Sequence, residues 1–85
     1  MEKHVGVVAV LISDRKNAAP KVNDLLTKFG GLIVGRMGIP YPARGLFVIT
    51  LIVDGSNDEI GALTGRLGAL PGVTAKSTLA KYNDK

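Results

Sequence analysis

Two stretches of this chain are apolar at nearly every position, and they restrict the fold more than any other feature. Residues 5–12 and residues 46–53 are built from valine, isoleucine, leucine and a few small or aromatic side chains. Successive side chains of a strand point to opposite faces of a sheet, so a strand of this kind has two apolar faces. Both stretches are therefore predicted to be central strands.

The first predicted helix covers residues 18–29. Asn17 is its expected N-cap, and Pro20 falls in the first turn, where its missing N–H has no intrahelical partner. Gly30 and Gly31 supply the left-handed stop. One face has apolar residues at helical spacing: Val22, Leu25, Leu26 and Phe29.

The second predicted helix begins at a capping box and runs to Leu70. Ser56 is the expected N-cap, and Glu59 stands three residues later, where its side chain can reach back to the Ser56 N–H. The apolar stripe of this helix consists of Ile60, Leu63, Leu67 and Leu70. Three glycines lie roughly opposite the stripe, and they either admit a close neighbour or are a tolerated weakness: Gly61, Gly65 and Gly68.

Residues 32–39 and residues 73–79 are predicted to be the outer strands. The element order is then βαββαβ, the α+β arrangement called ferredoxin-like. Right-handed crossovers give a four-stranded antiparallel sheet of order 4-1-3-2, with two helices on one face. We expect the 85 residues to form a single domain, 1–85. The two doubly apolar strands are the two that this topology makes central.

The helices of this fold cover only one face of the sheet, so an apolar face remains open. A monomer would leave this large patch in water, which usually marks an interaction site. We expect a homo-oligomer that buries the face or extends the sheet at an edge strand. The alternative is that the chain ends cover the face, although the C-terminal tail is polar. The expected interface residues are Val5, Val7, Ala9, Leu11, Val48, Thr50 and Ile52.

The residue inventory argues against catalysis and against metal binding. The chain has no cysteine and a single histidine, His4, so thiolate sites and histidine clusters are excluded. No serine, threonine or lysine has a recognisable base beside it in the sequence. We expect a protein that is not an enzyme and that uses no cofactor and no metal. The absence of a signal peptide or a membrane span predicts a cytoplasmic protein.

The turn after the first strand is the predicted ligand site. Residues 13–17 lead into a helix N-terminus, whose free N–H groups and dipole favour anions, and Arg15 and Lys16 add positive charge. The alternative is a solvated, capped turn without a ligand.

The sequence argues against nucleic acid as a partner. The net charge is +4, and RNA-recognition domains share the predicted topology. The segment Arg44-Gly45-Leu46-Phe47-Val48 is similar to the start of their motif, but it has a leucine where a stacking aromatic belongs, and the first strand has no aromatic residue. Binding would have to rely on a basic surface.

Several motifs together resemble the small iron-only hydrogenase system regulators. The resemblance spans nearly the whole chain, from the first strand and Asp14-Arg15 onward. The matching segments are Gly35-Arg-Met-Gly-Ile-Pro-Tyr41, Ile52-Val-Asp-Gly55, Asp58-Glu-Ile-Gly-Ala-Leu-Thr-Gly65, Leu67-Gly68, Leu70-Pro-Gly-Val73 and Lys76-Ser77.

This family is grouped with ACT-like domains and with the C-terminal domain of the nickel-responsive repressor. The resemblance implies an ACT-like fold, oligomeric assembly and a regulatory, non-enzymatic role in the expression or assembly of iron-only hydrogenase. ACT domains bind amino acids between subunits at the turn after the first strand, which by position corresponds here to Asp14, Arg15, Lys16, Asn17 and Ala18. The chain has Asn17-Ala18 where ACT domains have a glycine, and it lacks the histidines and the cysteine of the nickel site.

Overall fold

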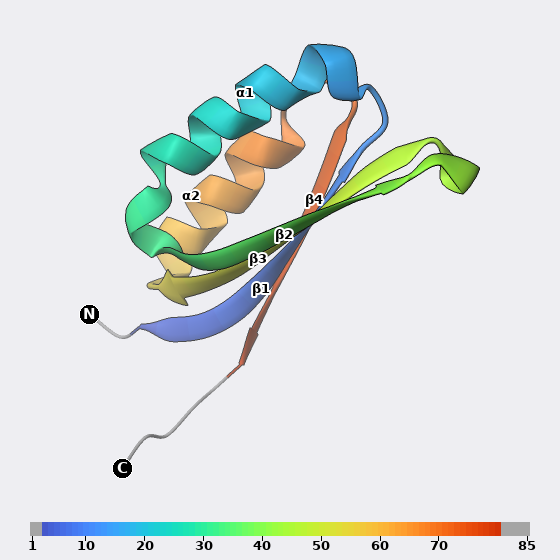
Figure 1. Ribbon diagram of the computed structural model, residues 1–85. Coiled ribbons are helices and arrows are strands. Elements are labelled where there is room, and N and C mark those ends of the chain that lie inside the picture. Colours follow the sequence, from blue (N-terminus) through green and yellow to red (C-terminus); the bar gives the residue numbers. More distant parts are fainter. Residues whose placement is uncertain (1–2, 81–85) are drawn as a thin grey trace.

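The computed structural model describes residues 3–80 and shows a four-stranded antiparallel sheet with both helices on one face (Figure 1). The strands lie in the order β2-β3-β1-β4, which is the predicted order. The elements are β1 (His4–Ile12), α1 (Arg15–Lys28), β2 (Ile33–Tyr41), β3 (Leu46–Gly55), α2 (Asn57–Gly68) and β4 (Val73–Ala80), with short 3₁₀ turns at Gly30–Leu32 and Pro42–Arg44. The predicted α+β, ferredoxin-like βαββαβ fold is confirmed.

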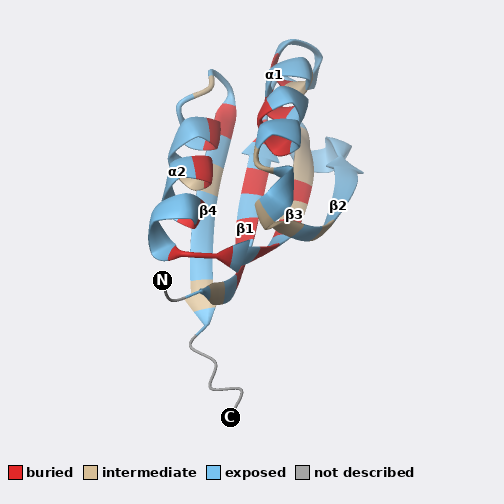
Figure 2. Ribbon diagram, turned by 90° about the vertical axis from the view of Figure 1, so that its left-hand side faces the viewer, coloured by how far each residue is buried: buried red, intermediate tan, exposed pale blue. Residues whose placement is uncertain are grey.

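The core lies between the helices and one face of the sheet. Alternate residues of the two central strands are fully buried there, as the red segments in Figure 2 show. The predicted helical stripes supply the other side, although Phe29 and Leu70 are only half-buried at its margin. The buried apolar residues are Val8, Val10, Ile12, Ala18, Val22, Leu25, Leu26, Ile49, Leu51, Val53, Ile60, Leu63, Leu67 and Val73.

Helix α1 begins three residues earlier than predicted, so the assignment of Asn17 as its N-cap is wrong. Asp14 occupies the N-cap position, and Asn17 lies in the first turn, where its Nδ2 donates a hydrogen bond of 2.8 Å to Asp14 Oδ2. Pro20 consequently lies in the second turn, not the first. The start of α1 is set by a residue far away in the sequence, because the Ser13 N–H donates a hydrogen bond of 2.8 Å to the Gly72 carbonyl.

Smaller boundary differences affect the other elements. Helix α2 ends at Gly68, two residues before the predicted Leu70. Strand β2 starts at Ile33 and continues through Pro40 to Tyr41, beyond the predicted end at residue 39. An edge strand tolerates proline because one side of its backbone faces solvent.

A β-bulge in β2 decides which way that strand presents its side chains. Ile33 pairs with Val53, but the next paired residue is Gly35, which lies opposite Ile52, so Val34 is an extra residue. One extra residue exchanges the two faces of everything that follows. After the bulge, Arg36 lies opposite the buried Leu51 on the helix side, while Met37 lies opposite Thr50 on the open face.

The predicted capping box of α2 is present in both directions. The Glu59 N–H donates to Ser56 Oγ at 3.2 Å, and the Ser56 N–H donates to Glu59 Oε1 at 2.9 Å. The hydrogen bond from the Ser56 backbone holds the pKa of the Glu59 carboxyl below its ordinary value, and the Ser56 side chain acts in the same direction. The ionised carboxylate therefore stabilises the start of α2.

Gly61 and Gly65 of α2 face outward, as predicted, but Gly68 lies beside β4, where a methyl group would be 3.9 Å from the Ala75 backbone nitrogen. A methyl group on Gly61 or Gly65 would meet nothing within 4 Å. Gly6 is the opposite case, because a methyl group there would lie 2.5 Å from Leu79 Cδ2 and 2.6 Å from the Thr78 carbonyl oxygen. Only glycine allows β4 to approach β1 at this point.

The capping box makes the stability of the protein depend on pH. A carboxyl with a lowered folded-state pKa contributes stability above its unfolded pKa and loses it as pH falls through the folded pKa. We expect the urea midpoint of the native protein to fall, relative to that of Glu59→Gln, as the pH drops below the ordinary glutamate value of 4.5. Glutamine can still accept the Ser56 hydrogen bond but does not titrate. Parallel midpoint curves between pH 7 and pH 3 would contradict this assignment.

The two kinds of glycine predict opposite effects of the same substitution. Gly65→Ala should raise the free energy of unfolding by about 0.5–1 kcal/mol, because alanine loses less backbone entropy in an exposed helix. Gly6→Ala should lower it by about 1–3 kcal/mol, because the new methyl group overpacks the contact with β4. Chemical denaturation of both variants tests the pair. A destabilised Gly65→Ala protein would mean that this helix face has a close neighbour.

Candidate functional site

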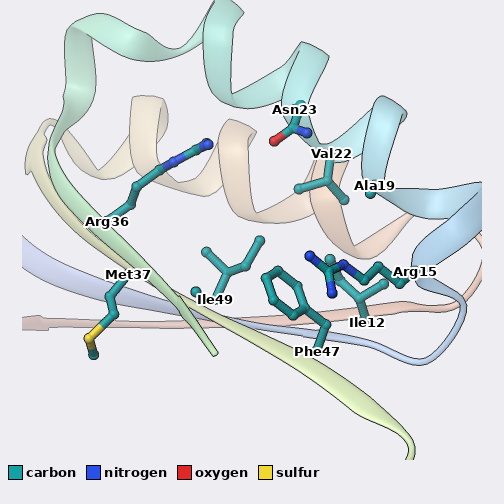
Figure 3. A pocket seen from close by; sticks show the side chains of 10 residues that line it. Ile12, Arg15, Ala19, Val22, Asn23, Arg36, Met37, Phe47 and Ile49 are labelled. Carbon is teal, nitrogen blue, oxygen red and sulfur yellow. The ribbon is translucent and has the colours of Figure 1, made fainter. Parts of the chain in front are cut away.

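A cleft between α1 and the edge strand β2 is the best-formed concave site among the described residues. Its volume is about 320 Å³. The side chains of Val22, Ile49 and Phe47 form an apolar floor, and three polar side chains stand around it: Arg15, Asn23 and Arg36. Figure 3 shows Arg36 reaching from β2 toward α1, with Arg15 on the other side of the cleft beside Phe47.

Of the five residues predicted to bind ligand, the structure brings only Arg15 to this cleft. Asp14 is the N-cap residue, and its carboxylate is engaged by Asn17. Lys16 and Asn17 are exposed on the first turn of α1, and Ala18 is buried in the core. These residues therefore form the start of α1, and of the five only Arg15 also lines the cleft, where it lies over Phe47.

Arg15 is held against an aromatic ring. Its guanidinium carbon lies 4.0 Å from the centroid of the Phe47 ring, within the range of a cation–π interaction. Phe47 in turn fits against β2 because Gly38 has no side chain, and a methyl group there would lie 2.9 Å from Phe47 Cζ. These contacts fix one end of the cleft.

Arg36 enters the cleft because of the β-bulge. In an uninterrupted ladder it would alternate to the open face, and Met37 would face α1. In the structure Met37 borders the cleft, but its side chain points away from it (Figure 3). Sequence reasoning missed both Arg36 and Asn23; a charged residue between glycines in a predicted strand was the only available signal for Arg36.

The cleft has positive charge and no acidic residue in its lining. Asp24 belongs to a groove on the other side of α1, shared with Arg66, and Asp54 and Glu59 line a hollow beside Lys3 and Phe29. Within residues 3–80 every carboxylate therefore lies outside the cleft, and its two guanidinium groups create a local positive potential.

The open face of the sheet is the second candidate site. Val5, Val7, Leu11 and Ile52 are each between 36% and 45% exposed, Ala9 is exposed, and Val48 and Thr50 are half-buried. Pairing places these residues on one face, since Val7 lies opposite Ile52, Ala9 opposite Thr50 and Leu11 opposite Val48. The bulge adds three apolar side chains that the sequence did not assign to this face: Met37, Ile39 and Tyr41, which are 50–59% exposed.

Other sequence expectations concern single residues. His4 is half-exposed at the start of β1, opposite Gly55, and residues 3–80 contain no group of three metal-binding side chains. Phe47 pairs with Ile12 and faces the helices, so it is not available for base stacking on the open face. Neither of the described helices is long and apolar enough to cross a bilayer.

Comparison with known proteins identifies the family. Residues 4–77 match the TM1266-like family, described as "Iron-only hydrogenase system regulator, putative". The structure is similar to that of the uncharacterized protein TM1266 from Thermotoga maritima, with a TM-score of 0.88 and 36% identity, covering 94% of this chain and 100% of that one. At this identity the chain is a relative of the Thermotoga protein.

More distant structures share the fold alone. The ACT domain from GTP pyrophosphokinase of Chlorobium tepidum has a TM-score of 0.74 at 18% identity, covering 91% of this chain and 100% of that one. The C-terminal domain of the MgtC protein from Mycobacterium tuberculosis has a TM-score of 0.72 at 14% identity, covering 91% and 87%. A comparison with curated proteins finds no match. The family match over residues 4–77, with the ACT-like fold, shows that this chain belongs to the TM1266-like iron-only hydrogenase system regulator family.

Proposed function

We propose that this chain is a non-enzymatic, homo-oligomeric regulatory module that binds a small ligand in the cleft between α1 and β2. The observation that carries the proposal is the bulge in β2. Consecutive residues of a strand point to opposite faces, and the bulge decides that Arg36 is directed into the cleft and Met37 onto the open face. A ligand that orders Arg36 would therefore act on the strand that also borders the proposed subunit interface.

The cleft is suited to binding and not to catalysis. Its lining has two arginines, one asparagine and otherwise apolar residues or glycine, without a serine, threonine, histidine or carboxylate. Such a set can orient an anion but offers no nucleophile and no general base near neutral pH. This supports a regulatory role, in agreement with the description of the family.

The open face supports assembly with a second copy. The apolar part of this face lies on β1, β2 and β3, because β4 presents Thr74, Lys76 and Thr78 there. About nine residues per strand at 3.3 Å and three strands at 4.8 Å give roughly 430 Å² before side-chain relief is counted. A typical stable interface buries about 800 Å² of accessible surface per partner, and an apolar patch of several hundred Å² commonly marks an interaction site. A twofold pairing would place two such faces together.

The process that this module serves is proposed from the family alone. A regulator of iron-only hydrogenase expression or assembly would act in the cytoplasm. The sequence contains no recognised DNA-binding segment, so an effect on transcription would pass through a partner protein.

A second candidate is a protein-interaction module without a ligand. It is favoured by the same open face, whose apolar side chains suit a protein partner whether or not the cleft is used. Nucleic-acid binding receives less support, because Tyr41 is the only aromatic side chain on the open face among the described residues.

A charge placed at the centre of the open face should dissociate the oligomer. In Ile52→Glu, whose neighbours on the adjoining strands are Val7 and Gly35, the new carboxylate would be buried without a partner at the interface, which costs several kcal/mol. Light scattering at micromolar concentration should show an oligomer for the native protein and a single chain for the variant, with unchanged circular dichroism. Ala62→Glu, on the exposed side of α2, is the matched control and should remain oligomeric. A monomeric native protein would refute assembly.

A thermal-shift screen separates the two candidate functions. A ligand that binds only the native state raises the midpoint by an amount that grows with its concentration. The regulatory proposal predicts that at least one compound among amino acids, nucleotides, organic acids and divalent metals raises the midpoint. A complete absence of shifts would favour the interaction module.

A further inference from the structure

We infer that the ligand of this cleft is a small dicarboxylate-like dianion, a molecule with two anionic ends and a short apolar middle. This inference rests on the proposed function, because it names the ligand class for the same site. Arg15 and Arg36 would hold the two anionic ends, and the floor of Val22, Ile49 and Phe47 would contact the middle.

The bulge argues that Arg36 is directed into the cleft for binding. Burial alone would favour the opposite arrangement, with Met37, Ile39 and Tyr41 beneath α1 and Arg36 in water. The structure instead leaves those three side chains 50–59% exposed and turns Arg36 toward the helix layer. Bulges commonly re-aim a side chain next to a functional site. Binding of an anion to Arg36 would offset the hydrophobic stabilisation that is lost because Met37, Ile39 and Tyr41 stay exposed.

The charges of the cleft select against other ligand classes. A free amino acid has an ammonium group, and this lining has no carboxylate to pair with it, only the neutral amide oxygen of Asn23. A cation would be repelled by both guanidinium groups. Each arginine can instead form paired hydrogen bonds with one carboxylate, and the Asn23 amide adds a neutral donor.

The positions of the two arginines favour two separate anionic groups over one. Arg15 lies over Phe47, and Phe47 pairs with Pro40. Arg36 is four residues before Pro40, which is about 13 Å along a strand. Figure 3 shows the two side chains approaching from different sides, with Val22 and Ile49 between them. The volume of about 320 Å³ is near the lower end for small-molecule sites, so the molecule is short.

The test uses the full chain and a set of simple anions at constant ionic strength. Succinate, glutarate and adipate vary the spacing between two carboxylates. Butyrate has one anionic end, inorganic phosphate has its charge at one centre, and L-leucine is a zwitterion of similar size. We expect one of the dicarboxylates to raise the thermal midpoint and to bind, by calorimetry, at least about tenfold more tightly than each of the three comparison compounds.

Three variants connect that binding to the cleft. Arg36→Gln and Arg15→Gln should each weaken binding of the best dicarboxylate by about tenfold or more, because each removes a charge-assisted pair of hydrogen bonds. Arg66→Gln is the matched control, since Arg66 also lies over an aromatic ring, Phe29, at 5.9 Å but belongs to a different groove. Its affinity should be unchanged. Arg36 is exposed, so its replacement leaves the core intact.

The possible failures can be told apart. If L-leucine, butyrate or phosphate binds as tightly as every dicarboxylate, or if Arg36→Gln binds normally, the dianion assignment is overturned while ligand-dependent regulation stands. If no dicarboxylate binds but the wider screen finds another ligand, the same conclusion follows. If neither set contains a ligand, both the ligand class and the regulatory proposal fail.

Discussion

Strands β1 and β3 pair over nine consecutive positions, from His4 opposite Gly55 to Ile12 opposite Phe47, and both helices pack on one side of this pair. The remaining elements are arranged around it, with β4 and β2 at the two edges. Because both strands are apolar on both faces, the helices can bury only half of their side chains. The exposed half is the basis of the proposed assembly with a second copy.

One extra residue in strand β2 decides which of its side chains face the cleft and which face the open side of the sheet. Val34 interrupts the ladder between Ile33 and Gly35, and the faces of the following residues are exchanged. The open face thereby gains apolar side chains, and the cleft gains a guanidinium. The position of Arg36 in the cleft and the contribution of β2 to the open face therefore depend on one irregularity at the sheet edge, where a bulge disturbs only one neighbouring strand.

Features that depend on residues close together in the sequence could be predicted, and features that depend on residues far apart could not. The capping box was recognisable because Ser56 and Glu59 are three residues apart and interact directly. The start of α1 was not, because Asp14 and Asn17 are both suitable caps, and the decision comes from the contact between Ser13 and Gly72, 59 residues away. Arg15 was recognised as a candidate ligand residue from its place near a helix start, whereas Arg36 and Asn23 become neighbours of the cleft only through tertiary packing.

The sequence by itself determined the order of the elements, the central position of two strands and the existence of an uncovered apolar face. These properties follow from local periodicity and from the handedness of chain crossovers. The tertiary structure alone decided where the concave site lies and which residues border it. The physical reason is that strand register is a long-range property: whether Arg36 faces α1 or the open side depends on how residues 33–35 pair with β3, and no local pattern in the chain specifies that pairing.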